Sequence, residues 1–104
     1  MNSTEKLSIL KKDLQIANTA NDEYLTFLLN TAEELMRIEG IHLASDDIKF
    51  EAVQIHYAAY LFRARAATNG ARFYSYNSSG STEARMPRFL RYELNELVFS
   101  KDND

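Results

Sequence analysis

Residues that could perform chemistry are few in this chain, and their spacing does not form a recognisable reactive site. The two histidines, His42 and His56, are fourteen positions apart, and no His-Glu-x-x-His or other metal-ligand spacing includes them. Asp46 and Asp47 stand where a helix would begin, and two acids there are first explained by the helix dipole. The sequence also lacks a Gly-rich phosphate loop and a Gly-x-Ser-x-Gly motif. We therefore expect no enzymatic activity, no cofactor and no metal.

Arginine and aromatic residues gather in the last third of the chain. Residues 63–91 hold six arginines against one acid, whereas residues 1–51 hold five basic and ten acidic side chains. Arginines among aromatics can bind nucleic acid through phosphate contacts and base stacking, although the acidic half and a pI near 5.4 oppose this. They also fit a solvated basic face. A third interpretation is that the basic third of one copy meets the acidic half of the next, and such head-to-tail contacts can close into a ring.

The residues predicted to contact another subunit or partner come from this basic third. The run before residue 77 is rich in aromatic side chains, and little sequence remains to cover them. Three more arginines follow a polar loop and lead into the last helix. The predicted contact residues are Arg72, Phe73, Tyr74, Tyr76, Arg85, Arg88 and Arg91.

Length and composition indicate one small domain spanning residues 1–104. A domain of this size buries only about 60–65% of its unfolded-chain surface, so partner subunits that cover more apolar surface would stabilise it. The chain has no cysteine, which excludes disulfides and suits a reducing compartment. Its polar N-terminal residues do not resemble a signal peptide, and no apolar run approaches the roughly 18 residues of a membrane span. We expect a soluble protein made in the cytoplasm, without a membrane partner.

With one proline and three glycines, the chain favours long helices, and we expect a small all-α bundle of about four of them. The first helix is expected over Thr4–Leu14, capped by Ser3 or Thr4. The second is expected over Asp22–Glu39, because apolar residues recur at spacings of three and four and Gly40 is a natural stop.

The third and longest helix is expected to start at Asp46 or Asp47, with Ser45 or Asp46 as its cap, and to end at Thr68 before Asn69-Gly70. Residues 52–62 contain no charged side chain, and a helix that is apolar nearly all round needs neighbours on several sides. It should therefore be the central helix. The residues expected to form the core between the second and third helices are Leu28, Leu35, Val53, Tyr57 and Leu61.

An extended loop or a short β-hairpin is expected before the last helix. Arg72–Tyr76 favours a strand that could pair with Thr82–Met86 around the polar loop Asn77–Thr82. A final helix is expected over Pro87–Phe99, because proline suits a first helical turn.

The order of these parts resembles a known family. A short helix with Leu7-x-x-Leu10 is followed by an acid-led second helix, 22–35, and by a central helix, 48–65, that ends in aromatic, alanine and arginine residues. A long loop and the short helix 87–94 complete the pattern. Over residues 5–99 the chain is similar to the small head–tail connector proteins, also called adaptor or head-completion proteins, of long-tailed bacteriophages and prophages.

The resemblance implies a structural adaptor without enzymatic activity, located at the head–tail junction of a virion. Such proteins form a ring of roughly a dozen copies beneath the portal. The ring extends the channel through which genomic DNA passes without sequence-specific binding, and it carries the next head-completion or tail protein. An acidic wall would let DNA slide without sticking. Two alternatives stay open: a DNA-associated prophage regulator and another small helical protein-binding module.

Overall fold

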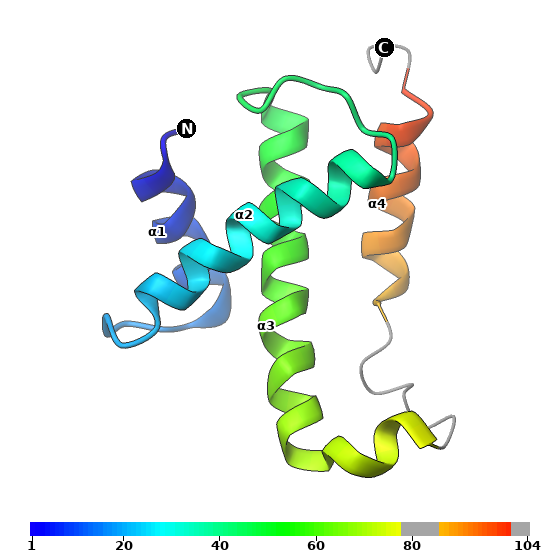
Figure 1. The fold of residues 1–104 in the computed structure, drawn as a ribbon. Helices are drawn as coiled ribbons and strands as arrows, with labels where there is room; N and C mark the ends of the chain where they lie inside the picture. The colour runs from blue at the N-terminus through cyan, green and yellow to red at the C-terminus, as the bar shows by residue number, and fades with distance from the viewer. Residues whose placement is uncertain (78–85, 101–104) are drawn as a thin grey trace.

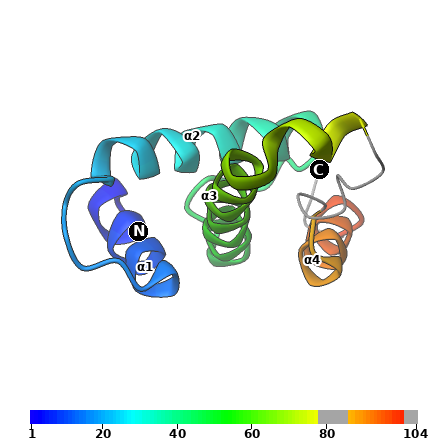
Figure 2. The same ribbon diagram turned by 90° about the horizontal axis from the view of Figure 1, so that it is seen from below.

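The computed structural model describes residues 1–77 and 86–100, and the side chains of residues 1–65 and 86–100. These residues form four helices and no strand: α1 (Ser3–Leu14), α2 (Asp22–Ile38), α3 (Ile48–Asn77) and α4 (Arg88–Val98). Figure 1 shows α2 crossing α1 and α3, and Figure 2 shows α2 as a layer above the other three helices. The expected all-α class with four helices is confirmed.

Helix α1 is capped one residue earlier than predicted. The Asn2 side chain accepts a hydrogen bond from the Glu5 backbone N–H at 2.8 Å, and the Asn2 backbone N–H donates to Glu5 Oε1 at 2.8 Å. This reciprocal pair is a capping box. The predicted caps, Ser3 and Thr4, lie outside it because glutamate at position 5 can only reach back to residue 2.

The link between α2 and α3 is fixed by a glycine and an aspartate. Gly40 adopts a φ of 100°, a left-handed conformation that ends a helix at little cost only with glycine. Helix α3 is capped by Asp47, whose Oδ1 accepts from the Lys49 backbone N–H at 2.8 Å. The predicted caps, Ser45 and Asp46, therefore lie two positions and one position too early.

Helix α3 continues past its predicted end at Asn69-Gly70 and runs to Asn77. A single glycine costs a helix only about 1 kcal/mol, and Ala71 and Arg72, which follow it, are good helix formers. Figure 1 shows that the last turns of α3 bend away from the direction of the rest. The strand predicted at Arg72–Tyr76 is therefore helix, and the hairpin is not confirmed. The predicted loop and second strand fall on residues 78–85, outside the described residues.

Helix α3 is central, as predicted, because it packs against each of the other three helices. Leu28, Val53 and Tyr57 are buried in the core, while Leu35 and Leu61 lie at its margin and stay partly exposed. The buried hydrophobic residues come from all four helices and from the α2–α3 link: Leu10, Leu25, Leu28, Leu29, Ala32, Met36, Ile41, Leu43, Phe50, Val53, Ile55, Tyr57, Ala58, Ala59, Leu90, Leu94 and Leu97.

Two polar side chains, Gln54 and Glu51, are buried beside this core. Gln54 joins three helices: its Nε2 donates to the Leu29 carbonyl of α2 at 2.8 Å, and its Oε1 accepts from Lys6 Nζ of α1 at 2.9 Å. Glu51 accepts from the Met1 ammonium at 2.6 Å. Both groups are thus paired, as buried polar groups must be to avoid a large desolvation cost.

Within the described residues, no helix is long and apolar enough to cross a membrane. Nor does that part of the chain bring together three side chains of the kinds that hold a metal ion.

Candidate interaction surface

Helix α4 carries apolar side chains on two opposite sides. Leu90, Leu94 and Leu97 point into the core and are buried. At 100° per residue, Phe89 lies on the flank of the helix, whereas Tyr92 and Phe99, the residue that follows the helix, lie roughly opposite the leucines. The side chains of Phe89, Tyr92 and Phe99 are 58%, 65% and 82% exposed. These three residues are called the aromatic face of α4 below.

A groove runs beside the aromatic face, where the C-terminal half of α4 lies near the start of α3. Tyr92, Glu96 and Phe99 line it from α4, and Lys49 lines it from α3. Ile48, next to Lys49, is largely exposed as well. Isolated exposed apolar residues are common, but several on one side of a short helix form a patch of the kind that marks interaction sites.

Polar contacts hold α4 in place from both sides. His56 Nδ1 of α3 lies 3.0 Å from Glu93 Oε1, and the His56 ring meets Phe89 edge-on with centroids 6.2 Å apart. On the other side, the Arg91 guanidinium donates to both carboxylate oxygens of Glu39, at 2.7 and 3.0 Å. These contacts orient the helix whose outer side carries the exposed aromatics. His56 thus has a structural role, in line with the absence of a metal-ligand spacing around it.

The contacts between α4 and its neighbours shift the pKa values of two side chains, Arg91 and Tyr57. The hydrogen bond to Glu39 raises the pKa of Arg91 above its usual value. Burial raises the pKa of Tyr57, and the nearby Glu39 carboxylate raises it further. The Glu39 carboxylate, directly after α2, thus contributes to both shifts, although burial is the main cause at Tyr57.

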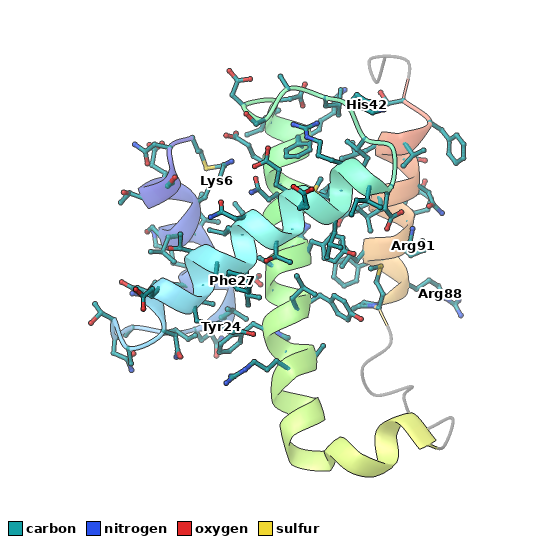
Figure 3. All side chains as sticks on the ribbon, viewed as in Figure 1. Lys6, Tyr24, Phe27, His42, Arg88 and Arg91 are labelled. Atoms are coloured by element: carbon teal, nitrogen blue, oxygen red, sulfur yellow. The ribbon has the colours of Figure 1, made fainter. Side chains whose placement is uncertain are left out.

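The structure separates the predicted contact residues into three groups. Arg88 is exposed on the first turn of α4 and projects away from the other helices (Figure 3). Arg91 is engaged within the chain by Glu39. The third group lies outside what the structure describes. It consists of Arg85 and of the side chains of Arg72, Phe73, Tyr74 and Tyr76. Only Arg88 is therefore placed as an available basic contact residue.

Sequence reasoning missed the aromatic face of α4. The leucines of this helix recur at the spacing of a core side, whereas the aromatics at 89, 92 and 99 had no role in the prediction of the contact residues. The signal was present, since these positions cannot share a side with Leu90, Leu94 and Leu97 in a helix. An aromatic side chain that does not pack into the core of a small domain is either covered by another molecule or exposed to water.

The geometry gives little support to a DNA-reading helix. Most side chains of α3 between residues 50 and 59 are buried against the other helices, whereas a recognition helix must present several polar side chains to base edges. Helix α4 presents aromatics together with both signs of charge. The surface is better suited to burial against another protein.

The chain matches no protein-family model, and it shows no significant similarity to a curated protein or to a solved structure.

Proposed function

We propose that this protein is a structural adaptor that acts by assembling with copies of itself and with neighbouring proteins. The observation that carries the proposal is the aromatic face of α4, whose three side chains are exposed and lie off the core side of the same helix. The charge asymmetry between the acidic first half and the basic last third supports it. So does the resemblance of the order of elements to phage head–tail connector proteins.

The size of the surface explains why such a protein would work as an assembly. A Phe or Tyr side chain has about 150–250 Å² to bury, so the three exposed aromatics offer on the order of 400 Å². At about 25 cal/mol per Å² this is worth about 10 kcal/mol on full burial. Association itself costs about 4–15 kcal/mol. A single contact of this kind is therefore weak, whereas a ring gains one further contact when it closes, without the association cost of another subunit.

The specific role we propose is that of a head–tail connector. Roughly a dozen copies would form a ring beneath the portal protein, in the manner of closed cyclic oligomers. The ring would extend the channel for genomic DNA, with no sequence-specific contact, and would dock the next head-completion or tail protein. The protein would then be made in the bacterial cytoplasm and end up in the virion.

The test compares the wild-type chain with a double variant, Tyr92→Ser with Phe99→Ser. We expect the wild type to form larger species in sedimentation experiments at high concentration, or on the portal protein from the same genome in electron microscopy. The double variant should stay monomeric with an unchanged circular dichroism spectrum. Ile9→Ser, on the exposed side of α1, is the control and should assemble normally. A wild type that stays monomeric in both settings, or a double variant that assembles like it, refutes the proposal.

The alternative functions predict different outcomes in the same samples. A prophage regulator would shift DNA in a gel at moderate salt, with an affinity that falls steeply as salt rises. A helical protein-binding module would form a closed dimer or a complex with one partner, and no ring.

A further inference from the structure

Helix α2 also has an outer side that faces away from the domain. Phe27 and Ile38 are 60% and 72% exposed, and exposed Glu34 lies between them on the same side of the helix. The buried residues of α2 lie on the other side, against α1 and α3. Phe27, Glu34 and Ile38 are called the outer face of α2 below; Figure 3 shows Phe27 on this helix next to Tyr24.

The outer face of α2 and the aromatic face of α4 match in length. From Phe27 to Ile38 the helix rises by eleven residues, or about 16 Å, and from Phe89 to Phe99 the chain advances by ten residues, or about 15 Å. Each therefore presents apolar side chains at both ends of a stripe about three turns long. Two such stripes can pack against each other along their whole length.

The charges of the two faces are complementary in one orientation. Arg88 stands beside Phe89 at the start of α4, and exposed Glu96 stands toward its end. On α2, Glu34 lies toward the Ile38 end. At the other end the guanidinium of Arg65 lies 4.8 Å above the Tyr24 ring, which in turn stacks on Phe27 with centroids 6.2 Å apart. No ion pair occupies Glu34, Arg88 or Glu96 within the part of the chain that the structure describes.

An antiparallel arrangement brings opposite charges to the same ends. With Phe89 beside Ile38 and Phe99 beside Phe27, it brings Arg88 to the end of α2 where Glu34 lies and Glu96 toward the end where Arg65 of α3 lies, each offset by a turn or more along the helix axis. The parallel arrangement brings Glu96 toward Glu34 instead. Within one molecule these faces cannot meet, since α4 packs on α3 while the outer face of α2 points away from α3.

We infer that the outer face of α2 is the docking site for the aromatic face of α4 of a second copy of this chain, in antiparallel orientation. The inference rests on the proposed function and identifies its subunit contact. Because the two faces are different surfaces, the contact is heterologous. A pair of copies therefore keeps one free face of each kind, and further copies can add until the assembly closes.

The test uses two variants that each destroy one face, Phe27→Asp and Tyr92→Asp. Each alone should be monomeric, because every contact needs one intact face of each kind. An equimolar mixture retains one functional contact, which is weak on its own, and should form nothing larger than a one-to-one dimer in sedimentation velocity, in a fraction that rises with concentration. Both substituted positions are exposed, so each variant should keep the helicity of the wild type.

Exchanging the charges of Arg88 and Glu34 provides a second test, which does not depend on Phe27→Asp or Tyr92→Asp. Arg88→Glu and Glu34→Arg should each raise the protein concentration needed for assembly at least tenfold. The chain that carries both substitutions should assemble at a concentration close to that of the wild type. If the wild type assembles but Phe27→Asp assembles equally well, or the mixture forms species larger than a dimer, the assigned faces are wrong and the proposed function stands. If the wild type never assembles, the proposed function fails and the inference with it.

Discussion

Arg37 provides a sharp test of how the link between α2 and α3 is held. Its Nη1 donates to the backbone carbonyls of Ile41 and Leu43, at 3.0 and 2.6 Å. Its guanidinium also lies 4.4 Å from the centroid of the Phe50 ring. Because Ile41, Leu43 and Phe50 are buried, one side chain fixes the path of the link and covers the start of α3.

The expected cost of removing Arg37 follows from these contacts. A hydrogen bond from a charged donor contributes about 1.5–3 kcal/mol, and a cation–π contact about 0.5–1 kcal/mol at a partly exposed site. The Arg37 side chain is itself partly exposed, at 32%, so water offsets part of the loss. We expect Arg37→Met, which keeps the apolar stem, to lower the free energy of unfolding by about 2–4 kcal/mol. That is a large fraction of the roughly 5–15 kcal/mol available to a domain.

Urea unfolding followed by far-ultraviolet circular dichroism measures this cost. Arg37→Lys should fall between the wild type and Arg37→Met, because an ammonium keeps the charge but lacks the planar fork that reaches two carbonyls. Glu33→Gln is the matched control: it removes only the 3.6 Å pair between Glu33 and Arg37 and should cost less than about 0.5 kcal/mol. An Arg37→Met variant as stable as Glu33→Gln would refute the reasoning, since the carbonyl contacts would then contribute nothing.

Three further predictions concern the core. Leu25→Ala should cost about 3–5 kcal/mol in urea unfolding because Leu25 is fully buried, whereas Leu35→Ala at the margin should cost about 1–2 kcal/mol. Gln54→Met should cost about 1–3 kcal/mol in the same assay, since it unpairs the groups of α1 and α2 that Gln54 joins. Because the pKa of Tyr57 is raised by folding, the unfolded chain loses that proton first, so stability present below about pH 10 falls as the pH rises. Melting temperatures of Tyr57→Phe should therefore fall less steeply above pH 10 than those of the wild type.

Much of the fold could be predicted because it depends on local patterns. The second helix was placed correctly to within one residue, since its buried stripe repeats at helical spacing and Gly40 has the conformation that the stop required. The central position of α3 followed from a long uncharged stretch that needs several neighbours. These features depend on residues close together in sequence, and a sequence shows those directly.

The errors arose where local signals compete. The first and third helices each offered several cap residues in a row, and the caps used were Asn2 and Asp47. At Asn69-Gly70 the stop signal was overridden by the helix formers on both sides. Alternative caps and helix ends differ in free energy by only about 1 kcal/mol. Residue types alone do not predict which alternative is favoured.

The candidate surface was harder to predict than the fold, because it is defined by what the core fails to cover. Composition indicated that a small domain rich in aromatics would leave some of them exposed. Which ones are exposed depends on how α4 turns against α3, and that is set by Leu90, Leu94 and Leu97. Among the arginines, sequence could not tell Arg88 from Arg91, although within the residues that the structure describes Arg91 has an acidic partner and Arg88 has none.

That difference changes how the surface should be probed. Arg91 lies one turn from Arg88, but its two hydrogen bonds to Glu39 connect α4 to the end of α2. Reversing its charge would place two carboxylates together and loosen the helix that carries the aromatic face, so a loss of assembly would report on the position of α4 and not on the contact. Reversing Arg88, whose side chain is exposed, leaves α4 in place. A substitution that blocks assembly is therefore informative at Arg88 without further controls, whereas at Arg91 it needs the compensating change at Glu39.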